Sequence, residues 1–419
     1  MKQYDSYKDS GVQWIGRIPS HWECASISHL TTSRSGGTPD RQKKEYWDNG
    51  TINWMSSGEV NKGMVYDTEE FITKLGSLNS SAKPLPKNSV MIALNGQGKT
   101  KGMAAVLKIK AACNQSLCAF SCDNRLHYMY LYYNFKSMYK YLRSQAGDDT
   151  RDGLAASFVK KQKIPLPPFT EQESIVNYID KKCAEIDKAI ATQQRRIELL
   201  QELRQNIITH AVTRGINPDV PLKDSGVEWI GMVPEHWGKC RFKDFVTLKT
   251  DVSLSDNKIG LENIEGKTGQ YIETNSEFEG NGVAFDINDI IYGKLRPYLQ
   301  KVWLATFAGN AVGDFFVFRC KRNCESKYLQ YLMLSDGFTS ECNGATLGAK
   351  MPRVSSDFIL SLPYYLPSIS EQQAIVAHII SETTKLDKLV AKANRQISLL
   401  QELKQSIITE VVTGKRKVC

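Results

Sequence analysis

The stretch that decides the architecture is DSGVQWIGRIPSHWE at residues 9–23, because it recurs as DSGVEWIGMVPEHWG at residues 224–238. Ten of the fifteen positions are identical. A longer repeat follows: residues 171–213 align with residues 371–413, with 21 of 43 positions identical. The chain therefore carries two copies of one head and two copies of one long segment.

The residues between these repeated ends show little similarity to each other. This pattern predicts two equivalent scaffolds that hold two inserts with related but distinct roles. The predicted boundaries are 1–23 for the first head, 24–164 for the first insert, 165–215 for the first long helix, 216–238 for a linker and the second head, 239–365 for the second insert, and 366–419 for the second long helix.

Both long segments place apolar residues at alternating spacings of three and four, and neither contains Pro or Gly. Such a seam predicts helices that pair with each other as a two-helix coiled coil of about 65 Å. The alternative is that each helix packs on its own globular insert. Thr170 and Ser370 stand where N-caps are expected. The seam residues are Val176, Ile179, Cys183, Ile186, Ile190, Ile197, Leu200 and Ile207, then Val376, Ile379, Leu386, Val390, Ile397, Leu400, Ile407 and Val411.

The two inserts are expected to be mixed α/β domains of one shared fold, which makes the fold class α+β with a pseudo-twofold internal repeat. In the first insert, residues 51–57, 88–96 and 102–109 are predicted to form strands, and residues 126–145 a Tyr-rich helix. In the second insert the predicted strands lie within residues 288–306 and 314–320, followed by a helix at 326–336.

The charge of the chain is uneven. The formal net charge is +9, and residues 24–164 alone carry 20 basic and 11 acidic side chains. Residues 239–365 carry 15 of each. This distribution favours a polyanionic partner for the first insert. No apolar run approaches the length of a membrane span, and the ten cysteines lack metal-site spacing, so we expect a cytoplasmic protein with free thiols.

The sequence offers no convincing catalytic, metal or nucleotide site. Gly98-Lys99-Thr100 follows an apolar strand, but Ala93 occupies the position where a phosphate-binding loop requires glycine. The remaining candidates are clusters of cationic and polar residues that could contact phosphates and base edges. They comprise Thr38, Arg41, Lys43, Lys99 and Lys101 in the first insert, and Lys294, Arg296, Lys350 and Arg353 in the second.

The chain resembles the specificity subunits of type I restriction–modification systems. The resemblance is carried by the twice-written DSGVxWIGxxPxHW head, by SGGTPDRQKKEYWDNGTINWMSSGEV in the first insert, and by the PLPPFTEQESIV and LPSISEQQAIV entries to the long helices. LPSISEQ lacks the double proline of the first copy. The match extends over essentially the whole sequence.

This resemblance implies a non-catalytic subunit whose inserts are target recognition domains, each reading one half of a bipartite double-stranded DNA sequence. The long helices would pack antiparallel and set the gap between the half-sites. Two methyltransferase subunits and two endonuclease/translocase subunits would be its partners. It implies no cofactor in this chain, because S-adenosylmethionine, ATP and Mg²⁺ would belong to those partners. The nine candidate residues above would lie near DNA.

Two other functions stay open at this point. The chain could be an assembly scaffold whose inserts bind protein, a reading that the neutral second insert favours. It could also be an NTPase built on Gly98-Lys99-Thr100. Salt-dependent DNA binding by the complex would separate the first function from the second, and nucleotide binding would test the third.

Overall fold

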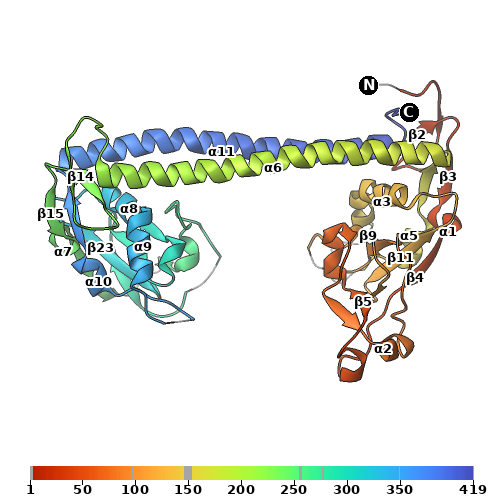
Figure 1. Ribbon diagram of the computed structural model, residues 1–419, viewed down its shortest axis with the longest axis horizontal. Helices are drawn as coiled ribbons and strands as arrows, with labels where there is room; N and C mark the ends of the chain where they lie inside the picture. The colour runs from red at the N-terminus through yellow and green to blue at the C-terminus, as the bar shows by residue number, and fades with distance from the viewer. Residues whose placement is uncertain are drawn as a thin grey trace. The chain divides into compact units, whose positions relative to one another are not determined.

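The computed structural model describes residues 3–96, 98–145, 153–253, 257–275, 278–348 and 350–418 (Figure 1). The chain divides into two compact units. Unit 1 comprises Met1–Thr192 and Gln396–Cys419, and unit 2 comprises Gln193–Arg395. Each unit therefore contains one end of each long helix, because α6 spans Phe169–Arg214 and α11 spans Ile369–Val412.

Unit 1 is built on a five-stranded sheet in the order β4-β11-β8-β9-β6, and a three-stranded sheet in the order β10-β5-β7 lies beside it. Its strands are β1 (Tyr7–Asp9), β2 (Arg17–Pro19), β3 (Glu23–Ser26), β4 (Thr31–Ser35), β5 (Ile52–Met55), β6 (Met64–Val65), β7 (Glu70–Ile72), β8 (Val90–Ala93), β9 (Ala104–Leu107), β10 (Ala112–Cys113), β11 (Leu117–Cys122) and β12 (Lys163–Leu166). Its shorter helices are α1 (Ile27–Leu30), α2 (Lys74–Leu78), α3 (Tyr128–Ser137), α4 (Tyr139–Ser144) and α5 (Ala156–Lys161), with 3-10 turns η1 (Lys44–Tyr46) and η2 (Ser57–Lys62).

Unit 2 has two four-stranded sheets, in the orders β16-β23-β20-β21 and β17-β19-β22-β18. Its strands are β13 (Leu222–Asp224), β14 (Met232–Pro234), β15 (Gly238–Arg241), β16 (Val246–Lys249), β17 (Val252–Ser253), β18 (Lys258–Ile259), β19 (Gly282–Phe285), β20 (Ile290–Gly293), β21 (Val302–Leu304), β22 (Gly309–Ala311), β23 (Phe315–Cys320) and β24 (Pro363–Leu366). Its shorter helices are α7 (Phe242–Phe245), α8 (Ser326–Leu334), α9 (Asp336–Gly344) and α10 (Ser356–Ser361), with 3-10 turns η3 (Leu261–Asn263) and η4 (Pro297–Leu299).

The expectation that the two inserts share a fold is confirmed by their strand pairing. The antiparallel order β4-β11-β8-β9 in unit 1 has the same chain connectivity as β16-β23-β20-β21 in unit 2. A parallel pair joins β10 to β5 in the first and β22 to β18 in the second. The expected strands and helices are also present, although the helix expected at 126–145 is broken at Met138 into α3 and α4.

Each insert is joined to the long helices by the same buried contacts. Tyr130 in α3 and Tyr328 in α8 are fully buried. The Tyr130 hydroxyl donates to the Val412 carbonyl, 3.1 Å away, and the Tyr328 hydroxyl donates to the Val212 carbonyl, 3.2 Å away. A last-turn carbonyl of one long helix is thus satisfied by the insert that packs on it, which fixes the insert against the helix.

The repeated Glu-Gln pair at the start of each long helix has a structural role. The buried Gln172 side chain donates to the Pro167 carbonyl and accepts from the His127 amide. Gln372 makes the matching bonds to the Pro367 carbonyl and the Glu325 amide. A buried carboxamide with both ends satisfied holds the helix start to the insert, which explains why this residue recurs.

The predicted N-caps are wrong by one or two residues. Because α6 begins at Phe169 and α11 at Ile369, Thr170 and Ser370 lie inside the first turn. At α11 the Ser368 hydroxyl accepts from the Glu371 amide at 3.3 Å. At α6 the equivalent position is Pro168, whose carbonyl accepts from the Glu171 and Gln172 amides.

Several seam residues are buried between the two long helices within each unit. In unit 1, Val176, Ile179 and Ile186 share a core with Ile407 and Val411. In unit 2, the core contains Ile208, Ala211 and Val212 of α6 together with Ile375 and Ile379 of α11. Within each unit both long helices also pack on the insert.

The two ends of the chain lie together in unit 1, where Figure 1 marks them. The Tyr7 hydroxyl donates to the Gly414 carbonyl at 3.1 Å. Gly414 has φ of 72°, and a Cβ there would lie 2.3 Å from the Pro19 ring, so only glycine fits. The nine cysteines in the described residues are all free thiols.

Candidate nucleic-acid interface

The four cationic candidates of unit 2 lie on two segments that the fold brings together. Leu295 forms a β-bridge with Arg353, and the Arg296 amide donates to the Pro352 carbonyl at 2.8 Å. A second bridge joins Leu347 to Arg353 and closes the loop that carries Lys350. Residues more than fifty positions apart in the sequence therefore form one basic surface.

Asp314 organises part of this surface. Its carboxylate pairs with Arg353, with Nε–Oδ1 at 2.9 Å and Nη2–Oδ2 at 3.0 Å, and it lies 3.9 Å from the Lys294 ammonium. The hydrogen bond to Asp314 raises the pKa of Arg353. Lys294 and Arg353 are thus partly neutralised inside the protein, which leaves less of their charge for an external anion.

Arg296, Lys350 and Arg353 are exposed, but within the described residues no hydrogen bond or ion pair holds the side chain of Arg296 or Lys350. Arg296 adopts φ of 51°, a left-handed conformation that costs a non-glycine residue about 1–3 kcal/mol. The neighbouring Leu347 is 78% exposed, and Met351 is 49% exposed. Exposed cations beside exposed apolar side chains suit contact with phosphates and base edges.

In unit 1, Thr38 lies in a segment packed too closely for any side chain on the preceding glycines. A Cβ on Gly36 would stand 2.1 Å from the Cys113 carbonyl, and a Cβ on Gly37 would stand 2.0 Å from the Ser81 hydroxyl. This packing places the Thr38 hydroxyl 2.6 Å from Gln115 Oε1, to which it donates. The exposed Gln115, absent from the sequence candidates, joins Thr38 as a group able to read adenine.

Arg41 is held inside its own domain. Its guanidinium makes a bidentate pair with Glu70, at 2.5 and 2.8 Å, and lies 3.7 Å from the Trp47 ring centre. The hydrogen bond from Arg41 lowers the pKa of Glu70. These contacts make Arg41 a cross-link of the insert, whereas nearby Lys43 approaches only the Tyr46 hydroxyl, at 3.4 Å.

The loop between β8 and β9 separates the last two candidates. Lys99 is exposed, but Lys101 is only 8% exposed, so Lys101 is not on the surface as the sequence led us to expect. Two residues missed from the sequence hold the loop: the Tyr139 hydroxyl donates to the Lys99 carbonyl at 2.6 Å, and Arg143 donates to the Gly98 and Lys101 carbonyls. No helix follows the loop, which removes the phosphate-binding-loop reading.

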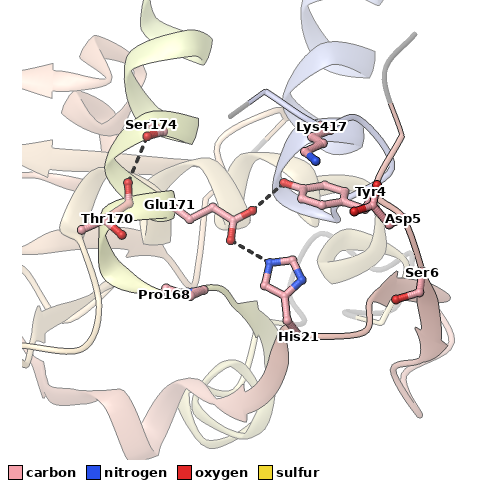
Figure 2. Close-up of a pocket in the computed structure, with 9 residues that line it drawn as sticks. All are labelled: Tyr4, Asp5, Ser6, His21, Pro168, Thr170, Glu171, Ser174 and Lys417. Carbon is pink, nitrogen blue, oxygen red and sulfur yellow. Dashed lines mark hydrogen bonds and ion pairs between the residues drawn. The ribbon is translucent and has the colours of Figure 1, made fainter.

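A separate cavity of about 440 Å³ lies where the first head meets the start of α6 (Figure 2). The Glu171 carboxylate accepts from the Tyr4 hydroxyl at 2.7 Å and lies 3.0 Å from His21 Nε2. In unit 2, His236 lies 2.9 Å from Glu371, whose other oxygen accepts from Trp237 Nε1 at 3.0 Å. Because the His–Glu pair recurs with each head, we interpret it as a contact that holds the head to the start of the long helix.

The described residues contain no group of three or more His, Cys, Asp and Glu side chains placed to hold a metal ion. Among the helices of the described ranges, none combines the length and apolar composition needed to cross a lipid bilayer.

Comparisons with known proteins show what this chain is similar to. Residues 19–201 match the model of the type I restriction modification DNA specificity domain. The type I restriction enzyme MjaVIII specificity subunit of Methanocaldococcus jannaschii is 20% identical over 96% of this chain and 94% of its own length. The EcoR124I/EcoR124II specificity subunit of Escherichia coli is 30% identical over 48% of this chain and 50% of its own length. Residues 19–201 therefore resemble a type I DNA specificity domain, and the chain is similar along most of its length to a type I restriction enzyme specificity subunit.

Solved structures share the fold of this chain. A chain from a study of complex assembly and conformational transition of the type I R-M system aligns over 94% of this chain and 98% of its own, with 14% identity and a TM-score of 0.66. The HsdS subunit from Thermoanaerobacter tengcongensis aligns over 97% of this chain and 100% of its own, with 15% identity and a TM-score of 0.50. Similarity to these DNA specificity subunits implies a role in DNA target recognition.

Proposed function

We propose that this chain is a non-catalytic reader of a bipartite double-stranded DNA sequence, with residues 24–164 reading one half and residues 239–365 the other. The observation that carries the proposal is the repeated architecture. The two inserts have one topology and are joined to the long helices by the same contacts. Their exposed candidate residues differ: the first insert carries Thr38 and Gln115, and the second carries Arg296 and Lys350. Equivalent frames with different contact residues suit two different half-sites.

The long helices would pair as an antiparallel coiled coil that sets the gap between half-sites. Within unit 1 the Lys404 ammonium lies 2.6 Å from Asp187, and within unit 2 Arg204 lies 2.5 Å from Asp387. Asp187 and Arg204 are 17 positions apart on α6, and Asp387 and Lys404 are 17 positions apart on α11. The earlier residue of each helix pairs with the later residue of the other, as a single antiparallel register requires. The 46 residues of α6 correspond to about 69 Å, about two turns of DNA.

The partners would be two methyltransferase subunits that methylate adenine, joined by two endonuclease/translocase subunits for cleavage. The repeated LLQEL sequence supports two equivalent docking sites, because its first and last leucines are exposed in both copies. S-adenosylmethionine, ATP and Mg²⁺ would be bound by those partners and none by this chain. A cytoplasmic location follows from a DNA substrate.

A methylation map tests this function. The chain is co-expressed with its methyltransferase subunit, and N6-methyladenine is located across the host DNA. We expect one two-part motif with a fixed gap, and replacing residues 24–164 with another insert of the family should change only one half. A stable complex that leaves the DNA unmethylated would contradict the proposal and favour the scaffold function.

The basic surface of unit 2 provides a second test. Arg296→Met and Lys350→Met should each reduce the slope of log affinity against log salt by about 0.9, the contribution of one lost phosphate contact. The control is Arg322→Met, an exposed cation on the turn after β23, which should leave the slope unchanged. Fluorescence anisotropy of the methyltransferase complex on duplex DNA gives the slope, and equal slopes for all variants would remove this surface from the interface.

A further inference from the structure

The largest cavity described for unit 1 is lined by cations and lacks an acidic residue. It has a volume of about 680 Å³ and lies among η2, the loop before β9, helices α3 and α4, and the C-terminal part of α11. The charged residues that line it are Lys62, Lys99 and Lys136, and Gln405 contributes from α11. A cavity whose charges share one sign favours a ligand of the opposite sign.

Lys62 is already neutralised. Its ammonium bonds Glu59 at 3.0 Å and Asp67 at 3.3 Å. The side chains of Lys99 and Lys136 have no such partner within the described residues, where Lys136 only approaches the face of the Tyr132 ring, at 5.3 Å. Two cations therefore border one cavity without a carboxylate bonded to either.

Lys136 is the poorly solvated member of this pair. Its side chain is half-buried, and burial lowers its pKa, although Cys183 and Asp187 act in the opposite direction. Asp187 is bonded to Lys404. The backbone of Lys136 is fixed because its carbonyl accepts from Gln405 Nε2 at 3.1 Å. A desolvated ammonium in a fixed position interacts more strongly with an anion than an exposed one does.

The loop that presents Lys99 is also fixed. Tyr139 and Arg143 of α4 bond the backbone carbonyls of Gly98, Lys99 and Lys101, and Gly102 and Met103 of the same loop line the cavity. A loop held at three carbonyls keeps its cation in place before any ligand arrives, which reduces the entropic cost of binding.

We propose that this cavity binds a phosphate group between Lys99 and Lys136, and that the phosphate belongs to the DNA backbone next to the half-site read by the first insert. This inference rests on the proposed function. The same chemistry would accept the phosphate of a free nucleotide, which the experiment separates from DNA. The recognition insert and α11 would then hold the DNA backbone jointly.

The test compares Lys136→Met and Lys99→Met with Lys136→Arg, which keeps the charge, and with Lys140→Met, an exposed lysine of α4 that does not line the cavity. The salt dependence of duplex DNA binding is measured for each methyltransferase complex. We expect the slope to fall by about 0.9 for each of the first two variants and to be unchanged for the last two. The methylated sequence should stay the same in all four.

A second measurement identifies the source of the phosphate. The melting temperatures of the wild-type and Lys136→Met complexes are measured with and without inorganic phosphate, and with and without AMP. The result is the difference between the two complexes in the shift that each ligand causes. An unchanged DNA slope with a variant-dependent shift in melting would assign the cavity to free phosphate and overturn the DNA assignment. No change in either measurement would overturn the site. Wild-type DNA binding without salt dependence would instead overturn the proposed function, while the melting comparison still decides the cavity.

Discussion

Trp22→Ala and Trp237→Ala should each destabilise their own unit by about 3–5 kcal/mol, the usual cost of removing a fully buried aromatic side chain. The two indoles are 0% and 2% exposed and lie in the core of the two units. Because the chain has two units, whole-chain melting does not report one transition. Hydrogen exchange of β11 and β23 peptides measures each unit separately, and loss of protection should be confined to the unit that carries the change.

The phenylalanine variants separate packing from hydrogen bonding at the same two positions. Trp237 Nε1 donates to Glu371, whereas Trp22 Nε1 is buried without a partner in the described residues, and Tyr4 occupies the corresponding oxygen of Glu171. Trp237→Phe should therefore cost about 1 kcal/mol more than Trp22→Phe, since only the former breaks a partly buried hydrogen bond. Equal losses would show that the bond from Trp237 contributes nothing to stability.

Charged substitutions in the LLQEL repeat should remove one partner subunit at a time. Leu199 and Leu203 are 48% and 46% exposed, and Leu399 and Leu403 are 47% and 45% exposed. Burial of two leucines in an interface contributes about 3–6 kcal/mol, so aspartate at either pair should weaken docking at least 100-fold.

The measurement is the mass of the complex purified with its methyltransferase subunit. Leu399→Asp with Leu403→Asp should leave one methyltransferase bound instead of two, and adding the same changes at Leu199 and Leu203 should leave none. Gln201→Asp is the matched control, because its exposed side chain lies about 200° around the helix from Leu199. Two methyltransferases on the quadruple variant would show that these leucines are not the docking surface.

The sequence predicted the features that depend on periodicity. The duplicated heads, the two long helices and strands such as β8 and β23 follow from repeats and from local apolar patterns. These features depend on neighbouring residues or on internal repeats, and both can be recognised in a single sequence. The juxtaposition of the four cationic candidates of unit 2 was not predicted, because it depends on bridges between segments far apart in the sequence.

The fate of individual side chains could not be predicted, because it depends on partners far away in the sequence. Arg41 pairs with Glu70, Arg353 pairs with Asp314, and Lys101 is buried within the loop that Arg143 of α4 holds. Each of these candidates was proposed for its positive charge, and contacts inside the protein make that charge less available to an external anion. Gln115 and Arg143 were missed because neither belongs to a basic cluster and their roles appear only with the backbone in place.

Because each unit contains one end of each long helix, the units are completed in a fixed order during synthesis. Unit 2 has all of its residues once Arg395 has been made. The insert of unit 1 is translated earlier, but the hydrogen bond from the Tyr130 hydroxyl cannot form until the Val412 carbonyl, 282 positions later, has been made. The insert of unit 1 is therefore synthesised first, but its packing is completed last. A premature stop near the end of the gene would damage unit 1, which is encoded mostly at its beginning, and leave the residues of unit 2 intact.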